Sequence, residues 1–357
     1  MTRSGKRTNF LETLLEAQRL AFAPFIFKAL SAALESGLLA AVERSEGGAD
    51  LETMARETNL SPYAAHLLLD ILSTVSIVER TETGWRTTEK GDLFLFDDLT
   101  RANFDFTDRV NFAGLEHTLE ALREGRPAGL QVFNADWETI YPHLPELPED
   151  ARRAWFRFDH FHSDRAYEAA LDKIEAWCPG AKSLCDIGGN TGRFTRRWLE
   201  RFPDARAVFV DLPVEARALL SRAEIRPYAE RIEVVEIDWL TDRELEGTAS
   251  CDLYWMSQFL DCFEEERVRS ILERTRRAMK PGAKLLVLEP LVGGQRHRAA
   301  ELSLAASSLY FTVMANGRSR FFEGPELRAL FEDSGFRIER EAEGLGISHT
   351  LFLLSEA

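Results

Sequence analysis

The 357-residue sequence has no long apolar run and little positive charge. No apolar stretch reaches the about 20 residues that a membrane-spanning helix needs. The first ten residues, MTRSGKRTNF, lack the apolar core of a secretory signal. Lys and Arg total 44 against 59 Asp and Glu, so the net charge is −15. Because phosphates and anionic lipid surfaces need a basic face, we expect a cytoplasmic protein that binds neither nucleic acid nor membrane.

Cysteine is also scarce, with four residues in the chain. None forms a CxxC pair, and Cys185 and Cys251 lie in apolar, strand-like runs. This pattern favours reduced core thiols over disulfides. No group of His, Cys and Asp has the spacing of a zinc site, so we expect no metal.

The N-terminal region reads as helices followed by a hairpin. Apolar residues recur every three or four positions over 10–45, Asp50 can cap a short helix through Glu57, and NLSP leads into a helix from Pro62. Residues 78–87 predict two short strands. This order is typical of a winged helix, which can bind DNA or dimerise. The helix PYAAHLLLDILSTV has no Lys or Arg to contact DNA, so we expect dimerisation for residues 1–100.

The rest of the chain falls into two parts. Residues 101–180 are rich in aromatic and polar residues and contain a proline-broken stretch near 142–149. We expect helices there that link the domains and help cover a ligand. From 181 to 357, strand-like runs alternate with helical patterns, which predicts an α/β domain with a parallel, doubly wound sheet. The two last runs are expected to form an antiparallel pair.

A glycine-rich turn follows the first strand of this sheet. SLCDI runs into GGNTGRF and then a helix, and Gly188, Gly189 and Gly192 allow a sharp turn with close approach of a ligand to the backbone. The turn fits neither GxGxxG nor a phosphate loop with its Lys, so a triphosphate or the NAD pyrophosphate is not expected. Asp186 precedes the turn.

Acids also end the second and third strands. Asp211 is placed to accept hydrogen bonds from two ribose hydroxyls, although VDLPVEA would equally make it a helix N-cap. Asp238, with Trp239 beside it, is placed to meet an adenine amino group, or it is a turn acid. The loop MSQF, which contains Ser257, follows the fourth strand and would face the far end of the ligand.

These segments resemble the small-molecule O-methyltransferases that have a winged-helix dimerisation domain. DIGGNTGRF is similar to their D-V-G-G-G-x-G motif, VFVDLP to their second strand, and KPGAKLLVLEPL, GRSRFFEGPELRALFEDSGF and HTLFLLSE follow in the family's order. The resemblance implies a homodimer with a class I methyltransferase fold, a Rossmann-like sheet and S-adenosylmethionine as cofactor. It implies the following cofactor contacts: Asp186, Gly188, Gly189, Gly192, Asp211, Leu212, Asp238, Trp239 and Ser257.

The chain departs from that family where the family has its catalytic histidine. Aligned without gaps from Asp252, the family His falls on Asp261 and the neighbouring Asp and Trp on Cys262 and Phe263. The family's two supporting acids fall on Glu289 and on a serine, Ser319. A phenol with a pKa near 10 needs a base, and burial can raise the pKa of a carboxylate such as Asp261 towards neutrality. Asp261 is alternatively a helix N-cap.

Two histidines in FRFDHFHSD are the other candidate bases. His160 and His162 precede the sheet, where the family places substrate-facing residues, although either can be an ordinary surface or core histidine. Their spacing of two prevents both from facing one way on a helix. We favour His160, because a neutral imidazole matches the proton transfer better than an ordinary carboxylate. His349 is expected to be structural.

The sequence thus supports three hypotheses. The first is methyl transfer to an oxygen, or an activated ring carbon, of a small aromatic or polyketide-like molecule of secondary metabolism. The second is a relative that binds S-adenosylmethionine but catalyses hydroxylation, decarboxylation or a pericyclic step, because the family His is lost. The third, a DNA-binding regulator, is disfavoured by the acidic charge.

Overall fold

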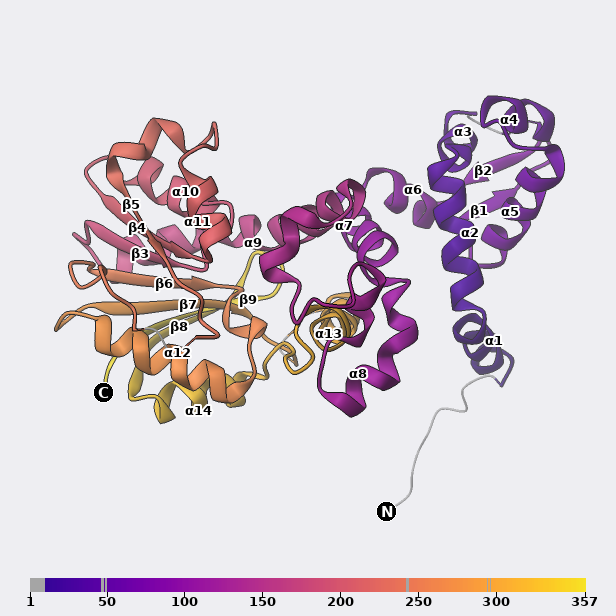
Figure 1. The fold of residues 1–357 in the computed structure, drawn as a ribbon. Coiled ribbons are helices and arrows are strands. Elements are labelled where there is room, and N and C mark those ends of the chain that lie inside the picture. The colour runs from indigo at the N-terminus through magenta and orange to yellow at the C-terminus, as the bar shows by residue number, and fades with distance from the viewer. Residues whose placement is uncertain (1–9, 46–47, 49, 242–243, 294, 296) are drawn as a thin grey trace, which may run out of the picture. The chain divides into compact units, whose positions relative to one another are not determined.

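The computed structural model describes residues 10–45, 48, 50–241, 244–293, 295 and 297–357, and the chain divides into two compact units, 1–108 and 109–357 (Figure 1). Residues 1–9, on which the prediction about a signal sequence rests, lie outside the described residues. No single described helix is long and apolar enough to span a membrane. The helix pair α2 (Ala23–Glu35) and α3 (Leu38–Arg44) passes that test together, by length and composition, but is bent by 67° at its break.

The first unit is helical apart from one small hairpin. Asp50 caps α4 and Ser61 caps α5, each by accepting a hydrogen bond from a backbone N–H in the first turn, and Pro62 opens α5. β1 and β2 pair antiparallel, as the sequence predicts. The elements are α1 (Phe10–Ala21), α2 (Ala23–Glu35), α3 (Leu38–Arg44), α4 (Leu51–Glu57), α5 (Pro62–Thr74), β1 (Val78–Arg80), β2 (Trp85–Thr87), α6 (Glu89–Phe96) and α7 (Asp98–Phe106).

The core of this unit forms where the helices and the hairpin meet. Leu38, Leu39, Met54, Leu69 and Leu72 are fully buried there. In contrast, α1 has no buried residue, although its sequence is amphipathic. The apolar face of α1 is therefore not used by the core of this unit.

A helical segment joins the two units and continues into the second. Its elements are η1 (Thr107–Asn111), η2 (Gly114–His117), α8 (Thr118–Glu124), η3 (Ala128–Val132), η4 (Tyr141–Glu146) and the 29-residue helix α9 (Glu149–Trp177). The predicted proline-broken stretch is η4. The division at residue 108 places most of the segment 101–180 in the second unit.

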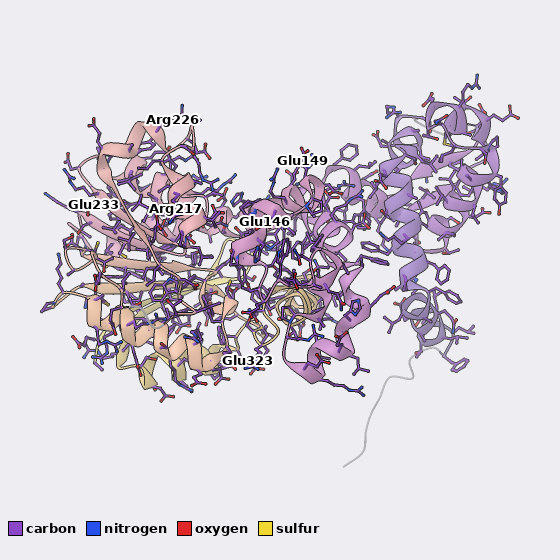
Figure 2. All side chains as sticks on the ribbon, in the orientation of Figure 1. Glu146, Glu149, Arg217, Arg226, Glu233 and Glu323 are labelled. Atoms are coloured by element: carbon purple, nitrogen blue, oxygen red, sulfur yellow. The ribbon has the colours of Figure 1, made fainter. Side chains whose placement is uncertain are left out.

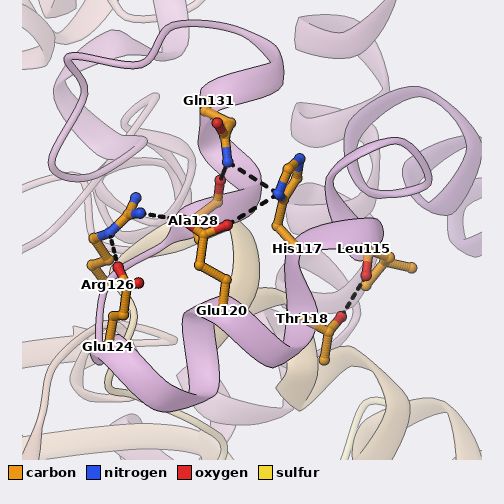
Figure 3. A network of polar contacts seen from close by, with 8 residues as sticks. All are labelled: Leu115, His117, Thr118, Glu120, Glu124, Arg126, Ala128 and Gln131. Carbon is orange, nitrogen blue, oxygen red and sulfur yellow. Dashed lines mark hydrogen bonds and ion pairs between the residues drawn. The ribbon is translucent and has the colours of Figure 1, made fainter.

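Polar contacts tie α8 to the neighbouring turns (Figure 3). His117 Nδ1 lies 3.2 Å from Glu120 Oε2 and 3.1 Å from Gln131 Nε2. Arg126 donates to Glu120 and Glu124. These groups are partly exposed, so solvent weakens each pair, and the network mainly fixes the local path of the chain.

The second unit contains a mostly parallel sheet whose strand order is β5-β4-β3-β6-β7-β9-β8 among the described residues. Residues 183–290 supply the five parallel strands, and β9 runs antiparallel between β7 and β8, as predicted. The strands are β3 (Ser183–Ile187), β4 (Arg206–Asp211), β5 (Ile232–Glu236), β6 (Leu253–Ser257), β7 (Lys284–Pro290), β8 (Phe336–Leu345) and β9 (His349–Glu356).

Helices cover both faces of this sheet, so its strands are apolar on both sides (Figure 1). Cys185 and Ile187 of β3 pack into one core, and Leu184, which precedes them, packs into the other. The remaining elements are α10 (Arg193–Arg201), α11 (Pro213–Leu219), η5 (Arg226–Arg231), η6 (Leu260–Cys262), α12 (Glu265–Ala278), α13 (Arg298–Tyr310), η7 (Phe311–Ala315) and α14 (Gly324–Asp333).

Ion pairs join α11 to the end of β5 and α10 to α9. Arg217 of α11, labelled in Figure 2, makes two hydrogen bonds of 2.8 and 2.9 Å to the Glu236 carboxylate at the end of β5. Arg197 and Arg201 lie four residues apart on α10, and they pair with Glu168 and Asp172, which lie four residues apart on α9. These ion pairs match the register of α9 to that of α10, and both helices reach the candidate site.

Candidate active site

The carboxyl ends of the parallel strands meet at one edge of the sheet. Ile187 of β3 pairs with Val210 of β4 and with Met256 of β6, and Ser257 pairs with Leu288 of β7. The strand order reverses beside β3, because β4 and β5 lie on one side and β6 and β7 on the other. In open α/β sheets, ligands bind outside the carboxyl ends at such a reversal.

The turn after β3, residues 188–192, is here called the glycine loop. Gly188 has a φ of +69°, and a Cβ there would lie 2.3 Å from the Phe259 ring. A Cβ on Gly189 would lie 2.3 Å from the Phe209 ring. Glycine is therefore required at both positions, and the loop brings bare backbone to the sheet edge. Gly192, with a φ of +79°, is the N-cap of α10.

The buried carboxylate of Asp186 binds the first turn of α10, directly after the glycine loop. Its side chain is 1% exposed, and its carboxylate accepts hydrogen bonds from the backbone N–H (3.1 Å) and the hydroxyl of Thr195. Burial raises the pKa of Asp186 to about 6. The structure thus assigns Asp186 contacts that hold the start of α10, and a cofactor contact by its side chain stays a prediction.

Asp211 lies at the end of β4, opposite the loop. Its Oδ2 accepts from the Asn190 N–H and its Oδ1 from the Leu212 N–H, both at 2.7 Å. Leu212, not Asp211, is the N-cap residue of α11, and no side-chain cap is present there. Burial raises the pKa of Asp211 to about 7. Each carboxylate oxygen has a second lone pair, so Asp211 can still accept hydrogen bonds from a ligand.

Asp238 and Trp239 follow β5. Asp238 Oδ1 accepts a 2.9 Å hydrogen bond from the Leu240 N–H, which is the turn role considered as its alternative. The Trp239 ring is buried, with the Arg274 guanidinium 4.8 Å from its centroid. Among the described residues, no hydrogen-bond partner reaches the buried Trp239 Nε1 or the Ser257 Oγ at the end of β6.

Helix α9 contacts the glycine loop at two points. Asn190 donates from Nδ2 to Asp159 Oδ2 at 2.9 Å, and His160 Nε2 lies 3.0 Å from Thr191 Oγ1. Burial and the neighbouring acid Asp164 raise the pKa of Asp159 to about 7. The sequence analysis missed Asp159 and Asn190, although Asp159 lies in the FRFDHFHSD segment that drew attention to the histidines.

The two candidate histidines lie in surroundings that lower their pKa values. Burial lowers the pKa of His160 to about 3 and that of His162 to about 4, with nearby arginines adding to the effect. The His162 ring packs against Phe158 at 4.6 Å between centroids. His349 is 1% exposed, and its Nε2 lies 3.0 Å from Gln258 Oε1. The contacts of His349 agree with a structural role.

Asp261 and Glu289, here called the acid pair, lie on the β6 and β7 side of the edge. Their side chains are 1% and 0% exposed. Asp261 is in η6, and the N-cap residue of the following helix α12 is Glu264, so the N-cap interpretation of Asp261 is wrong. Burial, followed by the nearby Asp159 carboxylate, raises the pKa of Asp261 to about 7.

A strained residue holds the turn that carries Asp261. Gln258 has a φ of +47°, which is rare for a residue with a side chain, and such strain persists only where neighbours fix it. Its N–H donates to Leu288 O and its side chain contacts His349. The next two N–H groups, of Phe259 and Leu260, both donate to Glu289 Oε1. The loop after β6 is therefore anchored to β7 and β9.

The sequence and structure can now be compared with known proteins. The family model described as the O-methyltransferase domain matches residues 157–337, which span the glycine loop, Asp211 and the acid pair. The chain belongs to this O-methyltransferase family. A second family model, the Dimerisation2-like domain, matches residues 15–85.

Several curated O-methyltransferases align with most of the chain. The 3-amino-4-hydroxybenzoate 4-O-methyltransferase of Streptomyces cremeus is 27% identical over 87% of this chain and 82% of its own length. The O-demethylpuromycin-O-methyltransferase of Streptomyces alboniger is 29% identical, over 85% and 78%. The solved mitomycin 7-O-methyltransferase shares the fold, with a TM-score of 0.74 at 21% identity, over 97% of this chain and 98% of that one.

These comparisons settle the class of enzyme. The chain is an S-adenosylmethionine-dependent methyltransferase with a class I methyltransferase fold, as the sequence predicts. A non-methylating enzyme and a DNA-binding regulator are not favoured. Among the described residues, no three His, Cys, Asp or Glu side chains form a group that could hold a metal ion.

Proposed function

We propose that this methyltransferase methylates a phenolic oxygen of a small aromatic metabolite and that Asp261 accepts the phenolic proton. The observation that carries the proposal is the buried carboxyl of Asp261 at the position where the family has its histidine. The Streptomyces relatives named above supply the substrate class by their names, one a methyltransferase of an aminohydroxybenzoate. Secondary metabolism is the setting that these names suggest.

S-adenosylmethionine fits the edge formed by β3, β4 and β6. The glycine loop has no room for side chains at Gly188 and Gly189, and Asp211 keeps acceptor capacity for ribose hydroxyls. Two buried groups at this edge, Ser257 Oγ and Trp239 Nε1, have no hydrogen-bond partner among the described residues and can meet a polar ligand. We place the cofactor against these residues, with Gly192, Leu212 and Asp238 beside them.

When bound, S-adenosylmethionine supplies an activated methyl group. The chain must then align the acceptor oxygen and remove its proton. Asp261 serves the second purpose better than the histidines, because its raised pKa lies nearer that of a phenol than the lowered pKa values of His160 and His162 do. We therefore propose Asp261 instead of His160 as the base. We propose that His160 supports the glycine loop through its contact with Thr191.

A screen of candidate phenols tests this function. The protein is incubated with S-adenosylmethionine and each phenol, and mass spectrometry looks for a product in which one methyl group replaces one hydrogen. We expect a methylated phenol and an equal amount of S-adenosylhomocysteine. Cofactor binding by calorimetry with no methylated product from any phenol would overturn the acceptor class but not the family.

We also propose that the first unit is a winged-helix dimerisation domain and that the enzyme is a homodimer in the cytoplasm. The Dimerisation2-like match and the exposed apolar side chains of α1, α2 and the turn between them support this. The large exposed side chains are Phe10, Leu11, Leu14, Leu15, Leu20, Phe22 and Phe25. Residues 101–180 and 181–357 are proposed to form the acceptor-covering segment and the catalytic domain. A full-length chain that sediments as a monomer at micromolar concentration would contradict the dimer.

A further inference from the structure

The acid pair is buried without a positive partner. Asp261 and Glu289 are at most 1% exposed, and no Lys, Arg or His of the described residues forms an ion pair with either carboxyl. The titratable groups that face the pair are Asp159 of α9, Tyr141 of η4, Tyr310 of α13 and Cys262 beside Asp261. The first of these is an acid and the other three are neutral hydroxyl or thiol groups, so nothing here balances two negative charges.

The two oxygens of Glu289 are in different situations. Oε1 accepts hydrogen bonds from the Phe259 N–H at 3.0 Å and the Leu260 N–H at 2.9 Å, which occupy both of its lone pairs. Oε2 is buried, and no donor among the described residues reaches it. The Asp261 carboxyl interacts with Glu289, and its backbone neighbour Leu260 is one of the two donors to Oε1.

Two ionised carboxylates cannot form a hydrogen bond with each other, because both only accept. With no cation paired to either acid among the described residues, like charges brought together in this buried site favour one protonated carboxyl. Oε2 is the oxygen that can carry this hydrogen, since Oε1 already serves as the acceptor of two N–H groups. Asp261 then stays ionised, with the Cys262 thiol 3.5 Å from its Oδ1.

We infer that Asp261 and Glu289 hold one proton between them, which sits on Glu289 Oε2 and is donated to the Asp261 carboxylate. Glu289 is thus a neutral positioning residue, which fixes the turn of Asp261 through Oε1 and orients its carboxylate through Oε2. This rests on the proposed role of Asp261 as proton acceptor. The family's supporting acid would here be a hydrogen-bond donor, because an aspartate has replaced the histidine beside it.

The proton balance of the reaction follows from this arrangement. The phenolic O–H bond breaks, and its proton moves to Asp261. The phenolic oxygen forms a bond to the methyl group, and the electron pair of the broken S–CH₃ bond stays on sulfur. The acid pair then holds two protons and is neutral. One proton must return to solvent before the next turnover, so Asp261 must be ionised at the start and the rate should fall at acidic pH.

Infrared difference spectroscopy tests the protonation directly and needs no acceptor. A protonated carboxyl has a C=O stretching band that is separate from the bands of a carboxylate. In the wild type minus Glu289→Gln difference at pH 8, we expect this band for one protonated carboxyl. No such band in that difference, with both proteins folded, would overturn the inference.

A second variant covers the case in which Glu289→Gln does not fold. In Asp261→Asn the acceptor of the Glu289 proton changes from a carboxylate to an amide, so the carboxylic acid band at pH 8 should shift in frequency from its position in the wild type. An unshifted band in Asp261→Asn would show that the proton is not donated to Asp261 and would contradict the inference.

Turnover supplies the positioning test once an acceptor is identified. Glutamine can keep both contacts of neutral Glu289, whereas alanine loses both. We therefore expect Glu289→Gln to lower kcat by less than tenfold and to keep the acid limb of the pH–rate profile in place, and Glu289→Ala to lower kcat more. A shift of that limb to lower pH by one unit or more in Glu289→Gln would show that Glu289 is normally ionised. If no phenol is methylated at all, the proposed function fails while the infrared result still decides the protonation.

Discussion

The cofactor side of the candidate site is held mainly by backbone contacts, whereas the acceptor side is held by buried acids. At the glycine loop, backbone N–H groups bind Asp186 and Asp211, and the glycines are required by the rings of Phe259 and Phe209. At the acid pair, Asp261 and Glu289 are both buried, and no cation of the described part of the chain pairs with either. The first side resembles the family motif closely and the second departs from it. Changes at the two sides should therefore affect different quantities, namely cofactor affinity on one and turnover on the other.

The largest effect is expected from Asp261→Asn. This variant keeps the shape of the side chain but removes the proton acceptor, so kcat should fall by roughly 10²–10⁴. The affinity for S-adenosylhomocysteine, measured by calorimetry, should stay close to that of the wild type. A variant with near-normal kcat would place the base elsewhere or make a base unnecessary.

Asp211→Ala should produce the opposite pattern. It removes a charged acceptor at the end of β4, and we expect S-adenosylhomocysteine binding to weaken by about 1–3 kcal/mol, which is roughly 5- to 150-fold in Kd. Asp204→Ala is a matched control, because Asp204 is an exposed acid at the other end of the same strand. Equal calorimetric affinities of the two variants would remove Asp211 from the cofactor site.

The raised pKa of Asp159 predicts a pH-dependent stability difference. Its pKa is about 7 in the folded protein and near 3.8 when solvated, so between these values the folded state binds more protons than the unfolded state. Its contribution to the free energy of unfolding is therefore present at pH 4 and is lost as pH rises through about 7. Asp159→Asn removes this dependence.

Thermal or urea unfolding at pH 5 and pH 8 measures the difference. Relative to the wild type, Asp159→Asn should be more stable at pH 8 than at pH 5, by on the order of 1–3 kcal/mol. Asp204→Asn, at an exposed acid, is measured alongside as the matched control. If Asp159→Asn and the wild type lose stability in parallel between these pH values, Asp159 does not have the raised pKa.

The smallest effect is expected at His160. Its ring is neutral and contacts Thr191, so His160→Ala should weaken S-adenosylhomocysteine binding by about 0.5–1.5 kcal/mol through the glycine loop and lower kcat by less than tenfold. Thr191→Val removes the other partner of the same contact. The double variant should be no weaker than either single one. A loss of kcat by 10²-fold or more in His160→Ala alone would restore this histidine as the base.

The parts of the fold that could be predicted from sequence depend on local geometry. A strand, a glycine turn and a helix follow one another at Ser183–Arg201, and only glycine fits at Gly188, so the sequence itself carries the signal. The caps Asp50 and Ser61 and the hairpin at Val78–Thr87 are equally local. The register of β3 with β4 and β6 then brings the predicted cofactor residues to one edge.

The acceptor side could not be predicted in the same way, because its contacts join residues far apart in the chain. The sequence left Asp261 open as a base or a helix cap, because neither the start of α12 after Glu264 nor the burial of Asp261 can be read from the local sequence. His160 was favoured as the base because its sequence does not show that the side chain is buried. This burial is what lowers the pKa of His160 in the structure. Asp159 gave no separate signal, since its contact is with Asn190 of the glycine loop.

Transfer of a labelled methyl group tests the central claim most directly. The wild type and Asp261→Asn are each mixed with S-adenosylmethionine that carries a deuterated methyl group and with one phenol found in the screen, and product is followed by mass spectrometry. We predict that the wild type places the intact deuterated methyl group on the phenolic oxygen, with one S-adenosylhomocysteine formed for each product, and that Asp261→Asn does so far more slowly. A product without the label, or equal rates for the two proteins, would contradict the account.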